Sequence, residues 1–167
     1  MNVSSTLLFL AITGASAAAT AADAERTPPA PSVFVKKAAL DGMTEVEAGK
    51  VALSKSQDPA IRDFAQRMVS DHGKANTELQ SLAARKGLSA PKQLDADHKQ
   101  MLDTLKGKNG KDFDAAYAEH MNMDHSKAIA LFESAAGSSD PDLAQFARQT
   151  LPTLKEHKAL ASKLAGQ

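Results

Sequence analysis

Histidine and carboxylate side chains are the groups of this 167-residue sequence that could bind a metal ion or transfer a proton. Two segments, MVSDHGKA at 68–75 and MNMDHSKA at 121–128, share the pattern Met-x-x-Asp-His-x-Lys-Ala in a chain with five histidines. Imidazole together with carboxylate suits iron, manganese, zinc or copper. The sequence contains no cysteine, which excludes thiolate metal ligands, disulfides and cysteine nucleophiles.

Apolar residues recur at helical spacing, and no segment alternates with a period of two over a useful length, so the sequence predicts an all-α fold. The predicted helices are 33–56, 59–86, 95–106, 111–136 and 141–164. Ser32 is the expected N-cap of the first helix, and Gly42 and Gly49 on its apolar face predict a closely packed neighbour. Four long helices that each bury one stripe form a four-helix bundle.

An internal repeat defines the order of the helices. DPAIRDFAQR at 58–67 aligns with DPDLAQFARQ at 140–149 without gaps, which predicts two helical hairpins, 33–86 and 111–164. The connection between them exceeds the two to eight residues of a tight helix–helix loop and contains the short helix. A long crossover of this kind predicts a ferritin-like bundle, with simple up-down-up-down winding as the alternative. Because this repeat pairs the second helix with the fourth, the shared Asp-His pattern is interpreted as convergence or chance.

The candidate site residues lie near the middle of the predicted helices. Projection at 100° per residue places His72 and His157 close to the centres of their apolar stripes. Residues 12 to 16 positions from the hairpin turns lie about 18–24 Å along the bundle at 1.5 Å per residue, so they can converge. The predicted metal ligands are Glu45, His72, Asp124, His125 and His157. A buried polar network without metal and partly solvated histidines remain alternatives.

Four segments resemble an exported bacterial family known as domain of unknown function 4142: FVKKAALDGMTEVEAGKVAL, FAQRMVSDHGKAN, DHSKAIALFE and LPTLKEHKAL. The resemblance implies a ferritin-like bundle in the periplasm or outer envelope and implies no established activity. The residues that match its helix segments are Glu45, Glu47, His72, His125 and His157. The di-iron site of ferritins uses Glu-x-x-His on two helices. This chain contains no Glu-x-x-His, which argues against ferroxidase chemistry.

The first 22 residues carry no charged side chain and combine a short apolar run with small residues. This pattern predicts a cleaved signal peptide at 1–22, with a disordered apolar leader as the alternative. The apolar run is shorter than the ~20 residues that span a bilayer, so we expect no transmembrane helix after cleavage. A proline-rich linker at 23–31 and the bundle domain at 32–164 follow. The expected location is the periplasm or the exterior of the cell.

Lys and Arg total 20, as do Asp and Glu, so no net charge attracts nucleic acid. The sequence therefore favours an exported binding or envelope-stress protein. A metal-dependent oxidoreductase or metal-storage protein is the alternative, and a structural or interaction protein with pH-responsive histidines is a third possibility. The expected partners are a metal ion, a second copy of the chain or an envelope component.

Overall fold

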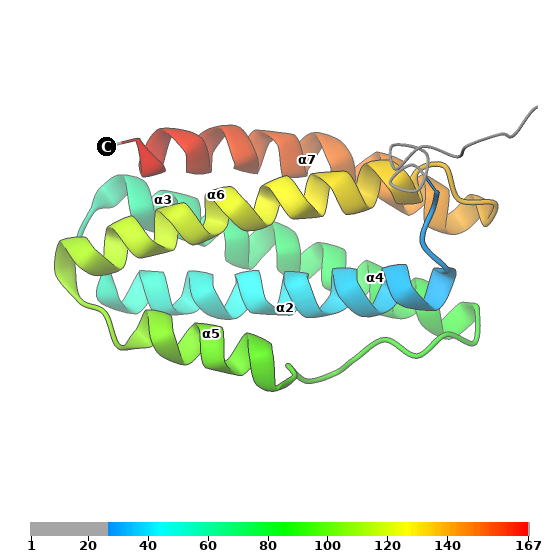
Figure 1. Ribbon diagram of the computed structural model, residues 1–167, viewed down its shortest axis with the longest axis horizontal. Helices are drawn as coiled ribbons and strands as arrows, with labels where there is room; N and C mark the ends of the chain where they lie inside the picture. Colours follow the sequence, from blue (N-terminus) through cyan, green and yellow to red (C-terminus); the bar gives the residue numbers. More distant parts are fainter. Residues whose placement is uncertain (1–26, 167) are drawn as a thin grey trace, which may run out of the picture.

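The computed structural model describes residues 27–166 as a bundle of helices (Figure 1). The predicted signal peptide and residues 23–26 of the predicted linker lie outside the described residues. The elements are α2 (Pro31–Lys55), α3 (Pro59–Arg67), the π-helical turn η1 (Met68–His72), α4 (Gly73–Arg85), α5 (Ala96–Lys106), α6 (Gly110–Ala135) and α7 (Pro141–Ala165). Residues 27–166 contain no β-strand, which confirms the all-α prediction. Within this range no helix is both long and apolar enough to cross a membrane.

Two hairpins make up the bundle, as the repeat predicts. The first pairs α2 with the continuous rod α3–η1–α4, and the second pairs α6 with α7 (Figure 1). The crossover runs from the end of α4 back along the bundle to the start of α6 and carries α5, which packs against α2 and α6. This arrangement is the predicted ferritin-like topology rather than up-down-up-down winding.

The two hairpin turns share their hydrogen bonds as well as their residues. Asp58 caps α3 by accepting two backbone N–H groups at 2.8 and 3.2 Å, and Asp140 caps α7 in the same way at 3.1 and 3.2 Å. The hydroxyl groups of Ser56 and Ser138 accept the backbone N–H groups of these aspartates at 3.1 and 3.2 Å. Proline occupies the first helical position after each cap, where its missing donor is harmless.

The start of α2 differs from the prediction. Ala30, rather than Ser32, is the N-cap, and it makes no side-chain cap hydrogen bond. Pro31 begins the helix because its fixed φ already matches helical geometry, so Ser32 falls inside the first turn. The expectation of close packing at the two glycines is confirmed. A side chain at Gly42 would overlap Asn76, and a Cβ at Gly49 would lie 3.0 Å from the Ala65 carbonyl oxygen.

The core consists of two apolar clusters arranged along the bundle. The first apolar cluster contains Phe34, Val35, Leu79, Leu82, Phe132, Leu143, Phe146 and Leu154 with several alanines. The second apolar cluster contains Ile61, Phe64, Met68, Leu102, Leu105, Phe113, Tyr117 and Met121, again with alanines. Each of the four long rods contributes to both clusters and therefore crosses the boundary between them. The candidate site lies at that boundary.

Candidate metal centre

Four polar side chains separate the two apolar clusters, one from each long rod. They are Glu45 of α2, His72 of η1, His125 of α6 and His157 of α7, with exposed fractions of 2%, 6%, 0% and 1%. We refer to these four residues as the polar layer. The four side chains contact one another, in keeping with the spacing argument from the hairpin turns, and all four are buried.

The π-helical turn η1 positions Asp71 and His72 of the first hairpin. Residues 68–72 follow π rather than α geometry, which accommodates an additional residue within the turn. Gly49 of α2 lies against this turn, since a Cβ there would be 3.0 Å from Val69 Cγ2 and 3.3 Å from Met68 Cβ. In a regular α-helix two consecutive residues project about 100° apart. In the observed turn both Asp71 and His72 contact His157 of α7.

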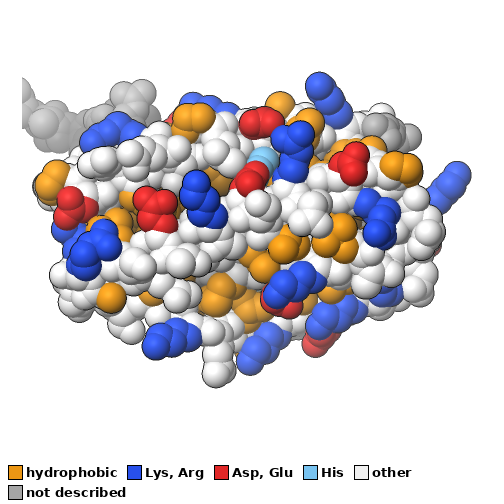
Figure 2. Space-filling view, turned by 180° about the vertical axis from the view of Figure 1, so that it is seen from behind, with side chains coloured by type: hydrophobic (Ala, Val, Ile, Leu, Met, Phe, Trp, Pro, Cys, Tyr) orange, Lys and Arg blue, Asp and Glu red, His pale blue; other side chains and the backbone are white. Residues whose placement is uncertain are grey.

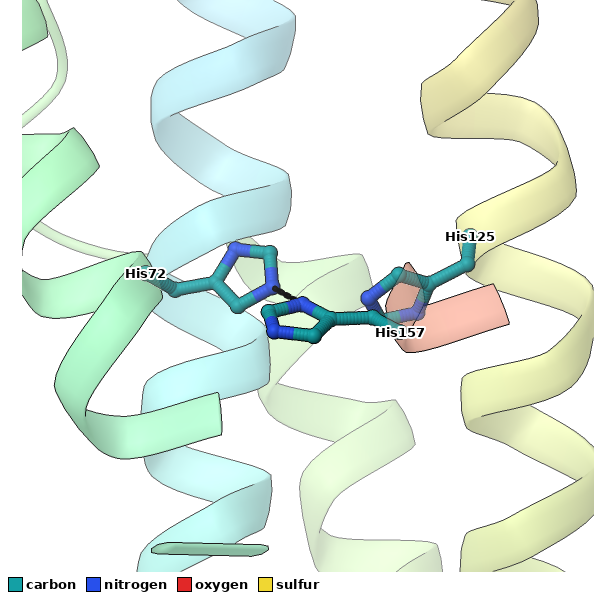
Figure 3. A group of neighbouring side chains, drawn as sticks. All are labelled: His72, His125 and His157. Carbon is teal, nitrogen blue, oxygen red and sulfur yellow. Dashed lines mark hydrogen bonds between the residues drawn. The ribbon is translucent and has the colours of Figure 1, made fainter. Parts of the chain in front are cut away.

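A chain of hydrogen bonds links the two hairpins through the polar layer. His72 Nδ1 lies 2.9 Å from Glu45 Oε2, and His157 Nε2 lies 3.0 Å from Asp71 Oδ2. Carboxylates only accept, so both of these ring nitrogens carry a hydrogen and donate it. The remaining nitrogens, His72 Nε2 and His157 Nδ1, face each other at 3.3 Å (Figure 3). Their lone pairs compete for one proton or one cation.

His125 adds a third inward-facing nitrogen. Its Nδ1 donates to the Met121 carbonyl oxygen at 2.8 Å and lies 3.4 Å from Glu45 Oε1. Its Nε2 is buried and has no hydrogen-bond partner among residues 27–166. Most buried polar atoms in folded proteins are paired, so an unpaired imidazole lone pair in the core requires an explanation.

One nitrogen from each of the three rings lies within 4.8 Å of those of the other two. The rings come from different rods and point toward one another (Figure 3). Two nitrogens bound to a tetrahedral ion at about 2.0–2.1 Å lie about 3.3 Å apart. The observed separation of His72 Nε2 and His157 Nδ1, 3.3 Å, matches that value.

The charges of the polar layer are concentrated in the first hairpin. Burial by itself raises the pKa of Glu45, but the His72 charge and hydrogen bond outweigh burial and lower it. Burial lowers the pKa of His72, and the Glu45 carboxylate reverses that effect, so the net shift is upward. Without metal, Glu45 and His72 therefore form a buried ion pair.

The two histidines of the second hairpin remain neutral. Burial lowers the pKa of His125. The Glu45 carboxylate opposes this effect and the charge on His72 adds to it, so the net shift of the pKa is downward. Burial and then the same His72 charge lower the pKa of His157 to about 4. Neutral imidazole is the form that coordinates metal ions. Two of the three rings are thus already in the metal-binding protonation state.

Asp124 is the predicted ligand that the structure does not bring into the polar layer. Its Oδ2 lies 3.0 Å from His120 Nε2 and its Oδ1 lies 3.3 Å from Lys127 Nζ. It lines a separate pocket with His98 and Asp41, between α2, α5 and α6. Asp124 precedes His125 by one residue on a regular α-helix, so it projects about 100° away from the core.

Asp71 is absent from the predicted ligand set, although the structure places its carboxylate against the ring of His157. Its sequence signal is its position before His72 in the repeated Asp-His pair, but an α-helical projection turns it away from the core. The repeated pattern also gains a structural meaning. Both of its methionines, Met68 and Met121, are fully buried in the second apolar cluster, and both of its histidines meet in the polar layer.

The fold and the buried cluster define the class: a ferritin-like helical bundle with a histidine-rich centre. Residues 15–164 match the family described as "Domain of unknown function (DUF4142)", and the chain belongs to that family. Its fold is also similar to the crystal structure of a DUF305 fragment from Deinococcus radiodurans. That likeness has a TM-score of 0.71 at 16% identity and covers 83% of this chain and 98% of the other, and it concerns the fold alone. A search of curated proteins gave no significant match.

Proposed function

We propose that this protein binds one late first-row transition metal ion, Zn²⁺ or Cu²⁺, through His72, His125 and His157. The observation that supports this most strongly is the orientation of the three rings. Each ring directs one nitrogen to an acceptor, which is Glu45, the Met121 carbonyl or Asp71, and leaves the other for the centre. Hydrogen-bond acceptors of this kind commonly orient metal-binding imidazoles in proteins.

The charge balance also favours a divalent cation. The metal-free centre contains two carboxylates, Glu45 and Asp71, and one imidazolium. A divalent ion that replaces the shared proton between His72 and His157 neutralises both carboxylates. Three neutral imidazoles and one open position form a ligand set typical of zinc sites that also bind water or substrate.

The ligand set discriminates among the metals that the sequence suggests. Manganese prefers carboxylate and water ligands, whereas imidazole suits zinc, copper and iron. A di-iron centre of the ferritin type needs several carboxylates that project inward. The polar layer contains one carboxylate, and that group is bound to His72. We therefore favour a single zinc or copper ion over a pair of irons.

We further propose that the metal-binding bundle acts after export, in the periplasm or outside the cell. The apolar, uncharged residues 1–22 and the proline-rich linker support this location. Fractionation of cells that express the full chain tests it. Recovery of the protein in the cytoplasm with residues 1–22 intact would contradict export and leave the metal site untouched.

Metal analysis of untagged protein tests the metal site. We expect one zinc or copper ion per chain after growth with added metal and gel filtration. The variants His72→Ala and His157→Ala should lose that ion. His98→Ala is the matched control, because His98 lies on α5, where its ring nitrogens contact Asp95 and Asp41 rather than the polar layer. Circular dichroism of each variant verifies that the bundle still forms.

Two results would contradict the metal proposal. One is substoichiometric metal in the wild-type protein after reconstitution with each ion. The other is equal metal content in the wild-type protein and in folded His72→Ala and His157→Ala variants. Either result would favour the alternative of a buried polar network that shares a proton and binds no metal.

A further inference from the structure

We propose that the metal ion reaches the polar layer through the pocket between η1–α4 and α7, and that the carboxylates around this pocket attract it as a cation. This inference rests on the metal site proposed above. It assigns the pocket a role as the cation entrance, and it identifies residues outside the ligand set that control the rate of binding.

The pocket opens to solvent on one side and ends at the polar layer on the other. Its volume is about 350 Å³, and its lining includes His72 and His157 together with Asp71, Glu78 and Glu156. Figure 2 views the molecule from the side of α4 and shows histidine surface beside acidic and basic side chains. The pocket therefore leads from the surface directly to two of the three proposed ligands.

Charge at the mouth favours a cation. Three carboxylates, Asp71, Glu78 and Glu156, line the pocket with a single cationic side chain, Lys74. Arg67 offsets part of this charge, since it lies 3.0 Å from Glu156. Surface charges that line a concave path raise the local concentration and association rate of an oppositely charged ligand.

Asp71 connects the mouth to the centre. Its side chain is 41% exposed, whereas that of Glu45 is 3% exposed. Asp71 also accepts the hydrogen bond of His157 Nε2, so one carboxylate contacts both the pocket and a proposed ligand. An incoming ion can meet this carboxylate before it displaces the proton between His72 and His157.

An independent observation concerns the inner end of this path. His125 Nε2 is fully buried behind the other two rings and has no hydrogen-bond partner in the part of the chain that the structure describes. The second pocket, lined by Asp41, Asp97 and Asp124, is also acidic, but its lining includes none of the three polar-layer histidines. This second pocket therefore serves as the control for the proposed entrance.

Stopped-flow binding of Co²⁺ or Zn²⁺ to the metal-free full chain tests the entrance. The double variant Glu78→Gln/Glu156→Gln should lower the association rate constant by about three- to tenfold at low ionic strength, with a dissociation rate constant within about twofold of wild type. Lys74→Gln should raise the association rate. Both effects should shrink in 0.5 M salt, where charges are screened within a few ångströms.

Asp97→Asn is the control, because it removes one negative charge from the second pocket. We expect it to leave both rate constants unchanged. Unchanged association in Glu78→Gln/Glu156→Gln, or slower association in Asp97→Asn, would overturn the proposed entrance while the metal site stands. Absence of metal binding in the wild-type protein would instead overturn the site itself, and equilibrium titration of the same samples distinguishes the two failures.

Discussion

The two hairpins share a turn but contribute different chemistry to the centre. The first contributes every charge of the metal-free centre, which comprises Glu45, Asp71 and the imidazolium of His72. The second contributes His125 and His157, whose lowered pKa values keep them neutral. The two hairpins therefore share the geometry of their turns but differ in the charge states of their histidines.

The helices that carry these residues differ in the same way. The second helix of the first hairpin contains the π-helical turn Met68–His72, whereas α7 runs as one α-helix that includes Pro152. The π turn brings two adjacent side chains, Asp71 and His72, to one partner ring. A local departure from α geometry thus allows one hairpin to supply both a proposed ligand, His72, and the carboxylate of Asp71, which orients another proposed ligand, His157.

The largest expected effect comes from the buried charge of the first hairpin. Glu45→Gln should lower the free energy of unfolding of the metal-free protein by about 3–5 kcal/mol, because it leaves His72 without its ion-pair partner. The second-hairpin variant His125→Gln removes a neutral ring and should cost about 1–2 kcal/mol. Urea denaturation in the presence of a chelator measures both values.

Glu47→Gln is the control for this comparison, since Glu47 is exposed and forms a surface ion pair with Lys50 at 2.7 Å. Its effect should stay within about 0.5 kcal/mol. If Glu45→Gln and His125→Gln lowered the free energy of unfolding by equal amounts, the charge of the polar layer would not be concentrated in the first hairpin.

The pH dependence of stability should separate the two hairpins. The pKa of His157 is about 4 in the folded protein, against about 6.5 for an unperturbed histidine. As the pH falls from 6.5 toward 4, the unfolded chain binds a proton that the folded chain does not. The contribution of His157 to the free energy of unfolding is therefore fully present above pH 6.5. Acidification removes up to about 3 kcal/mol of it.

The sign is opposite for His72, whose pKa is raised in the folded protein. Its contribution is present below its unfolded pKa and is lost as the pH rises through its folded pKa. Urea midpoints of the metal-free protein between pH 4 and 9 measure both limbs. His157→Gln should reduce the loss of stability at low pH, and His72→Gln should reduce the loss of stability at high pH. A profile that neither variant changes would contradict these assignments.

A smaller effect is expected from the carboxylate that orients His157. Asp71→Asn should weaken metal binding by about 10- to 100-fold, because it removes the charge that holds Nε2–H and leaves Nδ1 for the ion. The change should appear mainly as faster dissociation, unlike that of the pocket variants. Equilibrium competition with a chromophoric chelator measures it. Asp124→Asn, outside the polar layer, should bind like wild type, and a loss equal to that of Asp71→Asn would contradict the distinction.

The smallest effect compares the repeated turns. Asp58→Ala and Asp140→Ala each remove a helix cap and should each cost about 1 kcal/mol. Asp140 also accepts from Lys86 Nζ at 2.9 Å, so its removal should cost a few tenths of a kcal/mol more. Thermal and urea denaturation measure the difference. A larger loss of unfolding free energy in Asp58→Ala than in Asp140→Ala would contradict the expected additional contribution of Lys86 at the second turn.

The sequence alone determined the number of long helices, their hairpin pairing and the height of the polar residues. These properties follow from local rules: apolar spacing sets the helices, Asp-Pro turns set their starts, and a fixed rise per residue sets the height. His72, His125, His157 and Glu45 could be proposed for one layer of the core because all four inferences depend only on distance along the chain.

Tertiary structure decided which atoms of that layer face one another. The π turn that positions Asp71, and the carboxylate acceptors that fix the rings of His72 and His157, depend on contacts between rods. No local pattern specifies these contacts, because residues far apart in sequence make them and because one extra residue in a turn changes the direction of the side chains. The sequence brought the histidines to one level, and packing turned their lone pairs inward.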